Sequence, residues 1–136
     1  MFGLRKRRDA RLATVWERAL ALGNDRPRAG FGQSTCLGQV ARHRQRARSG
    51  TKAYVRWYCD GSVTAAWFEA SRPAVGAYVL AIGHFGHGPH HGEPVFYVGP
   101  RSWELIPAEA PAAFARQRRR EARASRRRAR GHLQAR

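Results

Sequence analysis

The sequence predicts a mostly β protein of the α+β class, in which a small five-stranded antiparallel barrel is flanked by an amphipathic N-terminal helix and a basic C-terminal helix or tail. Three observations support this prediction. Residues 51–107 contain short runs of alternating side chains that end at Gly, Pro or Asp-Gly turns. The apolar residues of 9–23 recur at helical spacing. Residues 108–136 consist largely of arginine and alanine, which are strong helix formers.

The N-terminal helix is predicted over residues 9–23, after a basic arm of residues 1–8. One apolar face is formed by Leu12, Val15, Trp16, Ala19 and Leu20, at the spacing i, i+3, i+4, i+7 and i+8. Asp9 is the expected cap at the start, and Gly23-Asn24 is the expected end. We expect the apolar face to pack on the barrel, and its insertion into a membrane interface is the alternative.

Residues 24–50 are predicted to be a basic linker. Pro27 and several glycines interrupt this segment, and it has little periodicity. Its second half carries the basic cluster Arg42, His43, Arg44, Arg46 and Arg48. A short helix from Thr35 to Arg46, capped by Ser34, is the alternative for this part of the chain.

From Lys52 onward the pattern is that of strands. Lys52–Cys59 and Ser62–Ala70 are predicted to form a hairpin around Asp60-Gly61, a strong turn signal. A two-residue loop would pair Cys59 with Ser62 and place Ala53, Val55 and Trp57 on the face of Thr64, Ala66 and Phe68. A three-residue loop would exchange Trp67 and Phe68 between the faces. The remaining strands are predicted at Ala77–Ile82, Val95–Val98 and Ser102–Ile106.

The order of turn glycine, apolar strand, glycine-rich loop and strand resembles the SH3-like barrels found in ribosomal and transcription proteins. The resemblance covers about thirty residues, mainly glycine and valine positions within 72–106. An OB-like barrel fits the same strand pattern. The resemblance implies a small closed or nearly closed barrel over residues 51–107, and either topology remains open at this point.

The C-terminal segment, residues 108–136, is predicted to be an arginine-rich helix or tail. Pro111 suits the first turn of a helix. Like charges recur at i, i+4, as in Arg116/Arg120 and Arg123/Arg127, and each such pair destabilises an isolated helix. We therefore expect the segment to fray alone in low salt and to form a helix when it lies along phosphates.

The charge of the chain is unevenly distributed, and this is the main indication of function. The formal net charge is +17 over 136 residues. Residues 1–51 carry twelve cations and three anions, residues 108–136 carry ten and two, and residues 52–107 carry four of each. A neutral folded centre with cationic flanks is typical of a module that binds a polyanion. We predict a non-catalytic nucleic-acid-binding protein, for DNA or RNA, whose basic arms contact the phosphate backbone.

The predicted phosphate contacts are three groups of basic residues. They are Arg116, Arg118, Arg119, Arg120, Arg123, Arg126, Arg127 and Arg128, then Arg5, Lys6, Arg7 and Arg8, then Arg42, Arg44, Arg46 and Arg48. Base or sugar contacts are predicted for Tyr54, Arg56 and Tyr58, which share one face of a strand in either register. Aromatic side chains next to a cation can stack bases while holding the backbone. The alternative is that these aromatics are buried under a terminal helix.

The loop Gly83–Glu93 contains four histidines, His84, His87, His90 and His91. They are weak candidates for metal ligands, because imidazole binds zinc but no paired-cysteine motif accompanies them. A loop that contacts a polyanion and becomes more cationic near pH 6 is the simpler interpretation. We expect no cofactor. A metal-dependent enzyme that uses this loop is an alternative function.

The sequence argues against most enzyme classes and against membrane proteins. It contains no P-loop, no Gly-x-Ser-x-Gly elbow and no convincing pair of catalytic carboxylates. No apolar run approaches the roughly 20 residues of a membrane span. Two cysteines without a secretory signal favour a cytoplasmic protein with free thiols. The second alternative function is a protein–protein adaptor, whose barrel binds a protein partner and whose basic tails keep it soluble.

Overall fold

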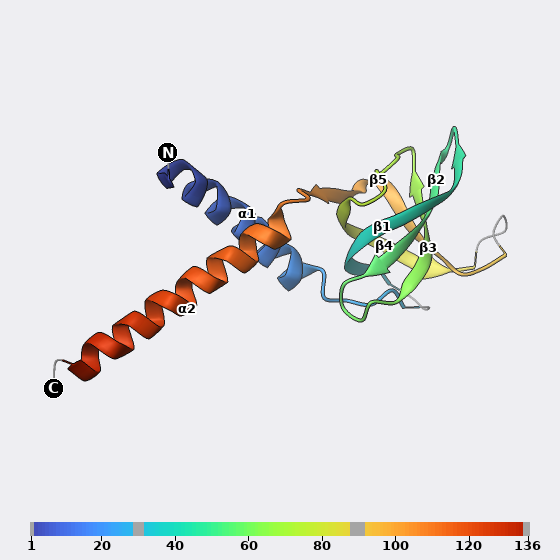
Figure 1. Cartoon of the computed structure of the whole chain (residues 1–136). Helices are drawn as coiled ribbons and strands as arrows, with labels where there is room; N and C mark the ends of the chain where they lie inside the picture. The colour runs from blue at the N-terminus through green and yellow to red at the C-terminus, as the bar shows by residue number, and fades with distance from the viewer. Residues whose placement is uncertain (1, 29–31, 88–91, 135–136) are drawn as a thin grey trace. The chain divides into compact units, whose positions relative to one another are not determined.

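The computed structural model describes residues 2–28, 32–87 and 92–134, and within them it contains two helices and five strands (Figure 1). The helices are α1 (Phe2–Leu22) and α2 (Ala110–Gln134). The strands are β1 (Ser34–Ala47), β2 (Gly50–Trp57), β3 (Val63–Glu69), β4 (Tyr78–Gly86) and β5 (Val95–Ile106). The chain divides into two compact units, one of Met1–Glu17 with Glu109–Arg136 and the other of Arg18–Ala108. The prediction of an α+β protein is confirmed.

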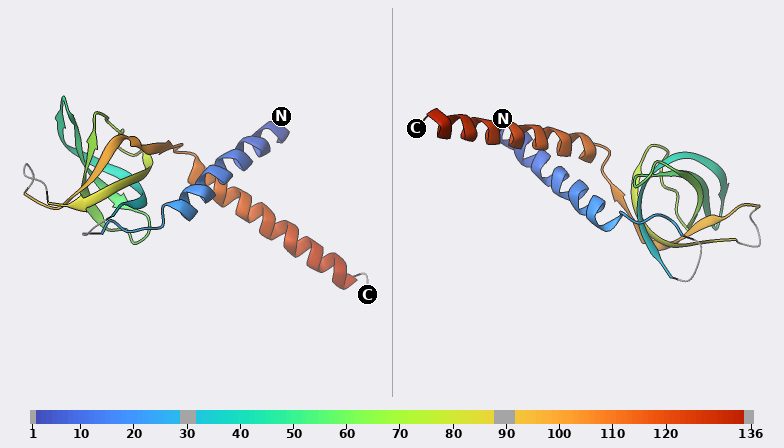
Figure 2. Two further views of the ribbon diagram at one scale, coloured as in Figure 1. Left: turned by 180° about the vertical axis from the view of Figure 1, so that it is seen from behind. Right: turned by 90° about the horizontal axis from the view of Figure 1, so that it is seen from below.

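The five strands close into a ring in the order β1-β2-β3-β5-β4, with β4 paired back to β1. Figure 2 shows the ring from two further directions. Four of the five strand pairs are antiparallel, but β3 and β5 run parallel, with Ala65 opposite Val95 and Phe68 opposite Val98. The prediction of an entirely antiparallel sheet is therefore wrong. β1 and β3 run in the same direction, because both are antiparallel to β2. β1 and β5 also run in the same direction, because both are antiparallel to β4, so β5 is parallel to β3 where the ring closes.

β1 lies within residues 24–50, which were predicted to be a linker or to contain a short helix. It is the longest strand, and it pairs with β2 along one edge and with β4 along the other. Its first half supplies Cys36 and Val40 to the core, whereas residues 41–47 are mostly exposed. Two bulges in the β1–β2 ladder, between Val40 and Arg42 and between His43 and Gln45, break the alternation that would identify a strand.

The β2–β3 hairpin has the faces expected for a two-residue loop, and not those of the three-residue alternative, but its register differs from both. Val55 lies opposite Thr64 and Arg56 opposite Val63, so the pairing is displaced by two residues from the expected one. A shift of two residues keeps every side chain on its face because the side-chain period of a strand is two. The turn has four residues, Tyr58–Gly61, instead of two, and Gly61 adopts a φ of +72° that favours glycine.

β5 contains both strands that were predicted at Val95–Val98 and Ser102–Ile106. Gly99 and Pro100, which lie between the two predicted strands, form an irregularity within β5, because Gly83 pairs with Val98 while Ala81 pairs with Trp103. The five strands of the ring are therefore not the five that the sequence predicted. β1 comes from the segment that was expected to be a linker. β5 combines two strands that were expected to be separate.

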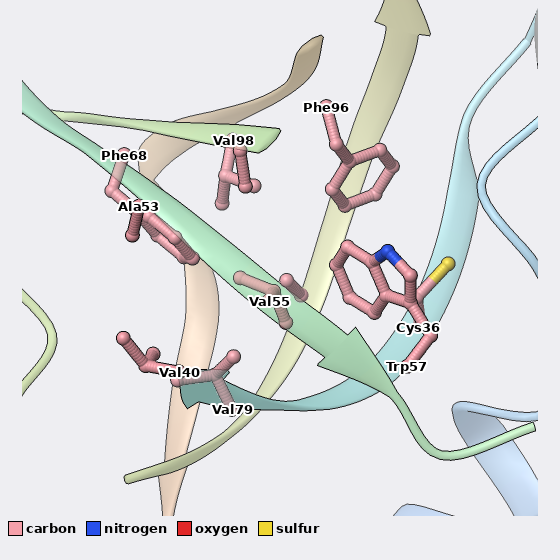
Figure 3. Close-up of a cluster of buried hydrophobic side chains, with 11 residues drawn as sticks. Cys36, Val40, Ala53, Val55, Trp57, Phe68, Val79, Phe96 and Val98 are labelled. Atoms are coloured by element: carbon pink, nitrogen blue, oxygen red, sulfur yellow. The ribbon is translucent and has the colours of Figure 1, made fainter. Parts of the chain in front are cut away.

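The core of the ring consists of the side chains that point inward from all five strands (Figure 3). Trp57 and Phe96 meet edge to face with ring centroids 5.2 Å apart, and both are fully buried. The indole nitrogen of Trp57 donates a 2.7 Å hydrogen bond to the Thr64 hydroxyl, so its polar atom is satisfied. Phe68 packs in the same way against Trp103, at 5.9 Å. Aromatic pairs of this geometry add stability beyond their buried area.

α1 begins at Phe2, so residues 2–8 of the predicted basic arm belong to the helix. Asp9, the expected cap, therefore lies two turns inside the helix and is buried. Trp16 and Ala19 of the predicted apolar face are buried, and Leu12, Val15 and Leu20 are partly buried. α2 extends from Ala110 to Gln134 without interruption.

Candidate nucleic-acid interface

The arginines of α2 form a stripe along the helix. At 100° per residue, seven of them fall within an arc of about 120°. They are Arg116, Arg119, Arg120, Arg123, Arg126, Arg127 and Arg130. Beyond Arg120 every residue of the described helix surface is exposed to solvent. The sequence predicted the charge of this segment, but the helix is what places the charges on one side.

The first two arginines of the stripe are held by the buried carboxylate of Asp9. Arg116 donates from Nε and Nη2 to the two carboxylate oxygens, both at 3.0 Å, and Arg120 donates from Nη2 at 3.1 Å. Asp9 is only 3 % exposed. A bidentate arginine fork is the strongest common partner of a carboxylate. Arg116 and Arg120, which the sequence assigned to phosphate, therefore connect α2 to α1.

These contacts set the ionisation of Asp9. The hydrogen bond from Arg116 is the largest influence, and with Arg120 it outweighs the opposing effect of burial and lowers the pKa of Asp9 to about 2. The same hydrogen bond raises the pKa of Arg116. Asp9 is thus a permanent anion at neutral pH, and it also separates two arginines that would otherwise repel each other along the helix.

A cationic groove opens next to this ion pair, within the unit formed by the two helices. It has a volume of about 430 Å³ and is lined by Lys6, Arg120, Arg123, Ala124, Arg127 and Arg128. Lys6, Arg123, Arg127 and Arg128 are exposed. None of the residues that line the groove is acidic. We call this feature the cationic groove. It brings one residue of the predicted N-terminal arm together with four of the predicted C-terminal arm.

The other predicted residues of this unit have varied surroundings. Arg5, Arg7 and Arg8 are exposed on α1, and Arg119 and Arg126 are exposed on α2. Arg118 lies over the ring of Phe114, with its guanidinium 5.4 Å from the ring centroid. It also lines a small hollow with Glu17 and Glu121, so its surroundings are less cationic than those of the groove.

On the ring, Arg42 and Arg44 of β1 lie near an ion pair between buried Lys52 and partly exposed Glu93, which the sequence did not indicate. Lys52 is 8 % exposed and contacts Glu93 at 3.1 Å. Tyr54 donates its hydroxyl to the same carboxylate at 2.9 Å. These two hydrogen bonds, with the nearby charges of Lys52 and Arg44, lower the pKa of Glu93. The guanidinium of Arg42 lies over the Tyr54 ring, 4.6 Å from its centroid. The Tyr54 side chain thus contacts Glu93 through its hydroxyl and Arg42 through its ring.

The other arginines of the basic cluster in residues 42–48 are open to solvent. Arg44, Arg46 and Arg48 are exposed. Arg46 donates from Nε to Nδ1 of His43 at 3.2 Å, which leaves Nε2 of the same ring to donate to the Pro73 carbonyl at 2.7 Å. His43 therefore fixes the position of Arg46 through a ring of defined tautomer.

Arg56 and Tyr58 line a second hollow, of about 190 Å³, on the outside of the ring. The other lining residues are Gly38, Gln39, Trp57, Gly61 and Tyr78. Arg56, Gln39 and Tyr78 lie side by side across three strands, because Gln39 pairs with Arg56 on β2 and with Tyr78 on β4. The sequence predicted Arg56 and Tyr58 but missed Gln39 and Tyr78, since nothing in their local pattern indicates which strands become neighbours. We call this feature the aromatic hollow.

The histidine loop is only partly within the described residues. Nδ1 of His84 lies 3.1 Å from the Gly32 carbonyl oxygen, and His87 is exposed. His90 and His91 lie outside the described residues. In the part of the chain that the structure describes, no group of three or more His, Cys, Asp or Glu side chains is arranged to hold a metal ion.

Neither helix is both long and apolar enough to cross a membrane, as far as the described residues go. Comparison with known proteins gives no match: no family model fits the sequence, and no curated protein or solved structure is significantly similar to the chain.

Proposed function

We propose that this protein binds nucleic acid without catalysing a reaction, and that the cationic groove and the adjoining arginine stripe of α2 contact the phosphate backbone. The observation that carries the proposal is the groove itself, where one lysine and four arginines converge without an acidic neighbour in its lining. Arg120 is paired with Asp9, but the like charges that remain repel one another, and counterions or a polyanion would relieve this repulsion.

The length of the stripe fits a nucleic-acid backbone. From Arg119, the first arginine of the stripe that is not bound to Asp9 in the described structure, to Arg130 the helix rises by about 17 Å, at 1.5 Å per residue. This distance spans about five nucleotide steps of one duplex strand, at 3.4 Å per step. Arginine suits this role because its planar fork can bind a phosphate through two hydrogen bonds. Contacts of this kind supply affinity with little sequence selectivity.

The topology of the ring favours a barrel of the OB-like kind over an SH3-like one within the same proposal. β1 pairs with both β2 and β4, and β3 lies parallel to β5, which gives the crossed strand order β1-β2-β3-β5-β4. An OB-like barrel is a five-stranded barrel with Greek-key connections, and many such barrels bind oligonucleotides. This likeness is one of architecture and supports the proposal without identifying a ligand.

A salt titration with matched variants tests the proposal. The groove variant replaces Arg123, Arg127 and Arg128 by glutamine, and the control replaces Arg28, Arg72 and Arg101, three exposed arginines outside the predicted contacts. Both variants lose the same net charge. If each groove arginine contacts a phosphate, the slope of log K against log salt on duplex DNA becomes shallower by about 2 to 3 in the groove variant. In the control it changes by less than about 1.

Two outcomes would contradict the proposal. Equal changes of slope in the two variants would mean that the net charge, and not the groove, attracts the nucleic acid. A wild-type protein that binds neither DNA nor RNA in dilute buffer would favour the adaptor function instead. Substitution is preferable to removal of residues 115–136, because that truncation would also leave the buried Asp9 without Arg116 and Arg120.

A further inference from the structure

We propose that the aromatic hollow receives one unpaired base, so that the protein prefers single-stranded nucleic acid to a duplex. This inference rests on the proposed function, which concerns the phosphate contacts of the helical unit, and it adds the substrate class. The ligand is a flat heteroaromatic ring joined to a phosphate backbone. A base inside a duplex presents only its edges, because its faces are covered by the neighbouring base pairs.

The hollow has the size and composition for this ligand. Its volume of about 190 Å³ is smaller than the roughly 300–1,000 Å³ of pockets that enclose drug-sized molecules, so it suits a single ring system. Two tyrosines, one arginine and one glutamine side chain line it. Aromatic faces bind bases by stacking whatever the base, and a nearby guanidinium can hold the backbone or stack in turn.

The sheet holds these groups in place. Gln39 lies directly between Arg56 and Tyr78 across adjacent strands, and directly opposed residues have Cβ atoms about 5 Å apart. The side-chain amide of Gln39 donates to the Gly76 carbonyl at 3.1 Å, which orients it. An oriented amide is a group that can read the edge of a base.

Tyr58 is anchored although it lies in a turn. Its backbone nitrogen donates to the Leu37 carbonyl at 2.9 Å. The turn is closed by Asp60, whose Oδ1 accepts hydrogen bonds from the Ser62 nitrogen at 2.9 Å and from the Ser62 hydroxyl at 2.6 Å. The Tyr58 side chain nevertheless remains 56 % exposed. A fixed backbone with an exposed aromatic side chain costs little entropy when a base stacks on it.

Tyr54, the third aromatic residue expected to contact bases, is not part of the hollow. Its ring is covered by Arg42, and its hydroxyl is bonded to Glu93. The inference therefore assigns base stacking to Tyr58 and Tyr78 and leaves Tyr54 a structural role. The test therefore changes Tyr58 and Tyr78, which line the hollow, and leaves Tyr54 in place.

A cycle that removes the tyrosines and the bases separately tests the inference on the full-length protein. The two strands are a fluorescently labelled oligothymidylate and an abasic strand with the same number of phosphates, so the electrostatic contribution is matched. Their binding is measured by fluorescence anisotropy at one salt concentration. The proteins are the wild type, the double variant Tyr58→Ala/Tyr78→Ala, the double variant Tyr58→Phe/Tyr78→Phe and the control Leu105→Ala, which removes an exposed leucine of β5.

We expect the wild type to bind the oligothymidylate about 5- to 150-fold more tightly than the abasic strand, the range that stacking of one base provides. The double alanine variant should bind the two strands equally, whereas the double phenylalanine variant and Leu105→Ala should retain the difference. Binding of a duplex should change by less than about twofold in every variant. Circular dichroism checks that each variant is folded.

The inference is overturned if the wild type binds the abasic strand as tightly as the oligothymidylate, or if the alanine variant loses affinity for both strands by the same factor. Equal losses with alanine and phenylalanine would also overturn it, because phenylalanine retains a stacking surface. These results differ from a failure of the proposed function, in which the wild type would bind neither strand nor a duplex.

Discussion

Gly38 allows β1 to lie close to the aromatic core. A Cβ atom at this position would overlap the Val55 side chain and would lie 2.8 Å from Cε3 of Trp57. Val55 and Trp57 belong to β2, and both are fully buried, so neither can move without disturbing the core. The glycine that made this segment resemble a linker is therefore required by the packing of the strand.

We expect Gly38→Ala to destabilise the protein by about 1–3 kcal/mol, the usual cost of overpacking a core. The matched control is Gly131→Ala, because nothing lies within 4 Å of the added methyl group there and the residue is in α2. The control should be neutral or slightly stabilising, since alanine favours helix over glycine. Urea unfolding followed by tryptophan fluorescence measures both. Equal stabilities of the two variants would contradict the close packing described for β1.

At the level of elements, one buried carboxylate connects the two helices. Asp9 accepts three hydrogen bonds from two arginines of α2, which are one helical turn apart. A buried charge is tolerated when its partners satisfy it, and removal of one partner leaves an uncompensated charge. The sequence suggested a helix cap at this position, because Asp often caps helices and the basic residues ahead of it resembled a separate arm.

The Asp9 contact predicts a specific dependence of stability on pH. The pKa of Asp9 is about 2 in the folded protein, below its ordinary value of 3.8 in an unfolded chain. A lowered pKa means that the contribution is fully present above about pH 4 and is lost as the pH falls toward 2. Asp9→Asn should therefore be less stable than the wild type at pH 6, and the difference should shrink between pH 4 and pH 2.

The measurement is thermal unfolding across this pH range, followed by circular dichroism at 222 nm. The difference in stability between Asp9→Asn and the wild type should approach zero at the acidic end. The control is Glu109→Gln, which changes an exposed carboxylate of the same unit. It should show no comparable trend. A constant difference between Asp9→Asn and the wild type at all pH values would show that the ion pair does not contribute as described.

β1 shows why a strand can escape detection in the sequence. Its inward side chains end at Val40, and the rest of the strand carries Arg, His and Gln side chains on both sides of two bulges. Its partner β4 is distant in sequence, and its partner β2 follows after a two-residue turn, but the bulges hide the regular alternation of this hairpin. By contrast, β2 and β3 adjoin a turn signal and bury one regular face, so their existence could be predicted.

At the level of the whole molecule, the closed ring makes Cys36 a probe of global unfolding. Cys36 lies on β1 with no exposed surface. Burial, and then the charges of Asp25 and Cys59, raise the pKa of its thiol to about 12. Cys59 is exposed, but partial burial of its thiol, and then the charge of Asp60, raise the pKa of this thiol as well. A thiol reagent must also reach the sulfur atom, so the exposed Cys59 should react much faster than the buried Cys36.

We expect a thiol reagent such as Ellman's reagent at pH 8 to label Cys59 alone in the native protein and both cysteines in guanidinium chloride. Cys59→Ser should show almost no labelling until the ring unfolds, and its rate should then follow the unfolding equilibrium. Cys36→Ser is the complementary control and should retain the rapid labelling. Rapid labelling of native Cys59→Ser would mean that β1 separates from the ring without global unfolding.

The charge of the whole chain could be assigned to its parts from the sequence, but its arrangement could not. Counting residues identified two cationic segments and a neutral centre. The structure adds that Lys6 and the arginines of α2 line one groove, while Arg116 and Arg120 are engaged by Asp9. The aromatic hollow depends in the same way on strands that are distant in sequence.

The sequence alone determined the features that depend on neighbours within a few residues. These are the α1 face that contains Trp16, the face of β2 that carries Tyr54 and Arg56, and the separation of charge. Periods of 3.6 and 2 are visible in consecutive residues, and charges can be counted along the chain. Only the tertiary structure decided that β1 closes the ring, that Asp9 binds α2 and that Gln39 and Tyr78 lie beside Arg56. These contacts join residues far apart in the chain, and their free energy comes from burial and pairing that no local pattern contains.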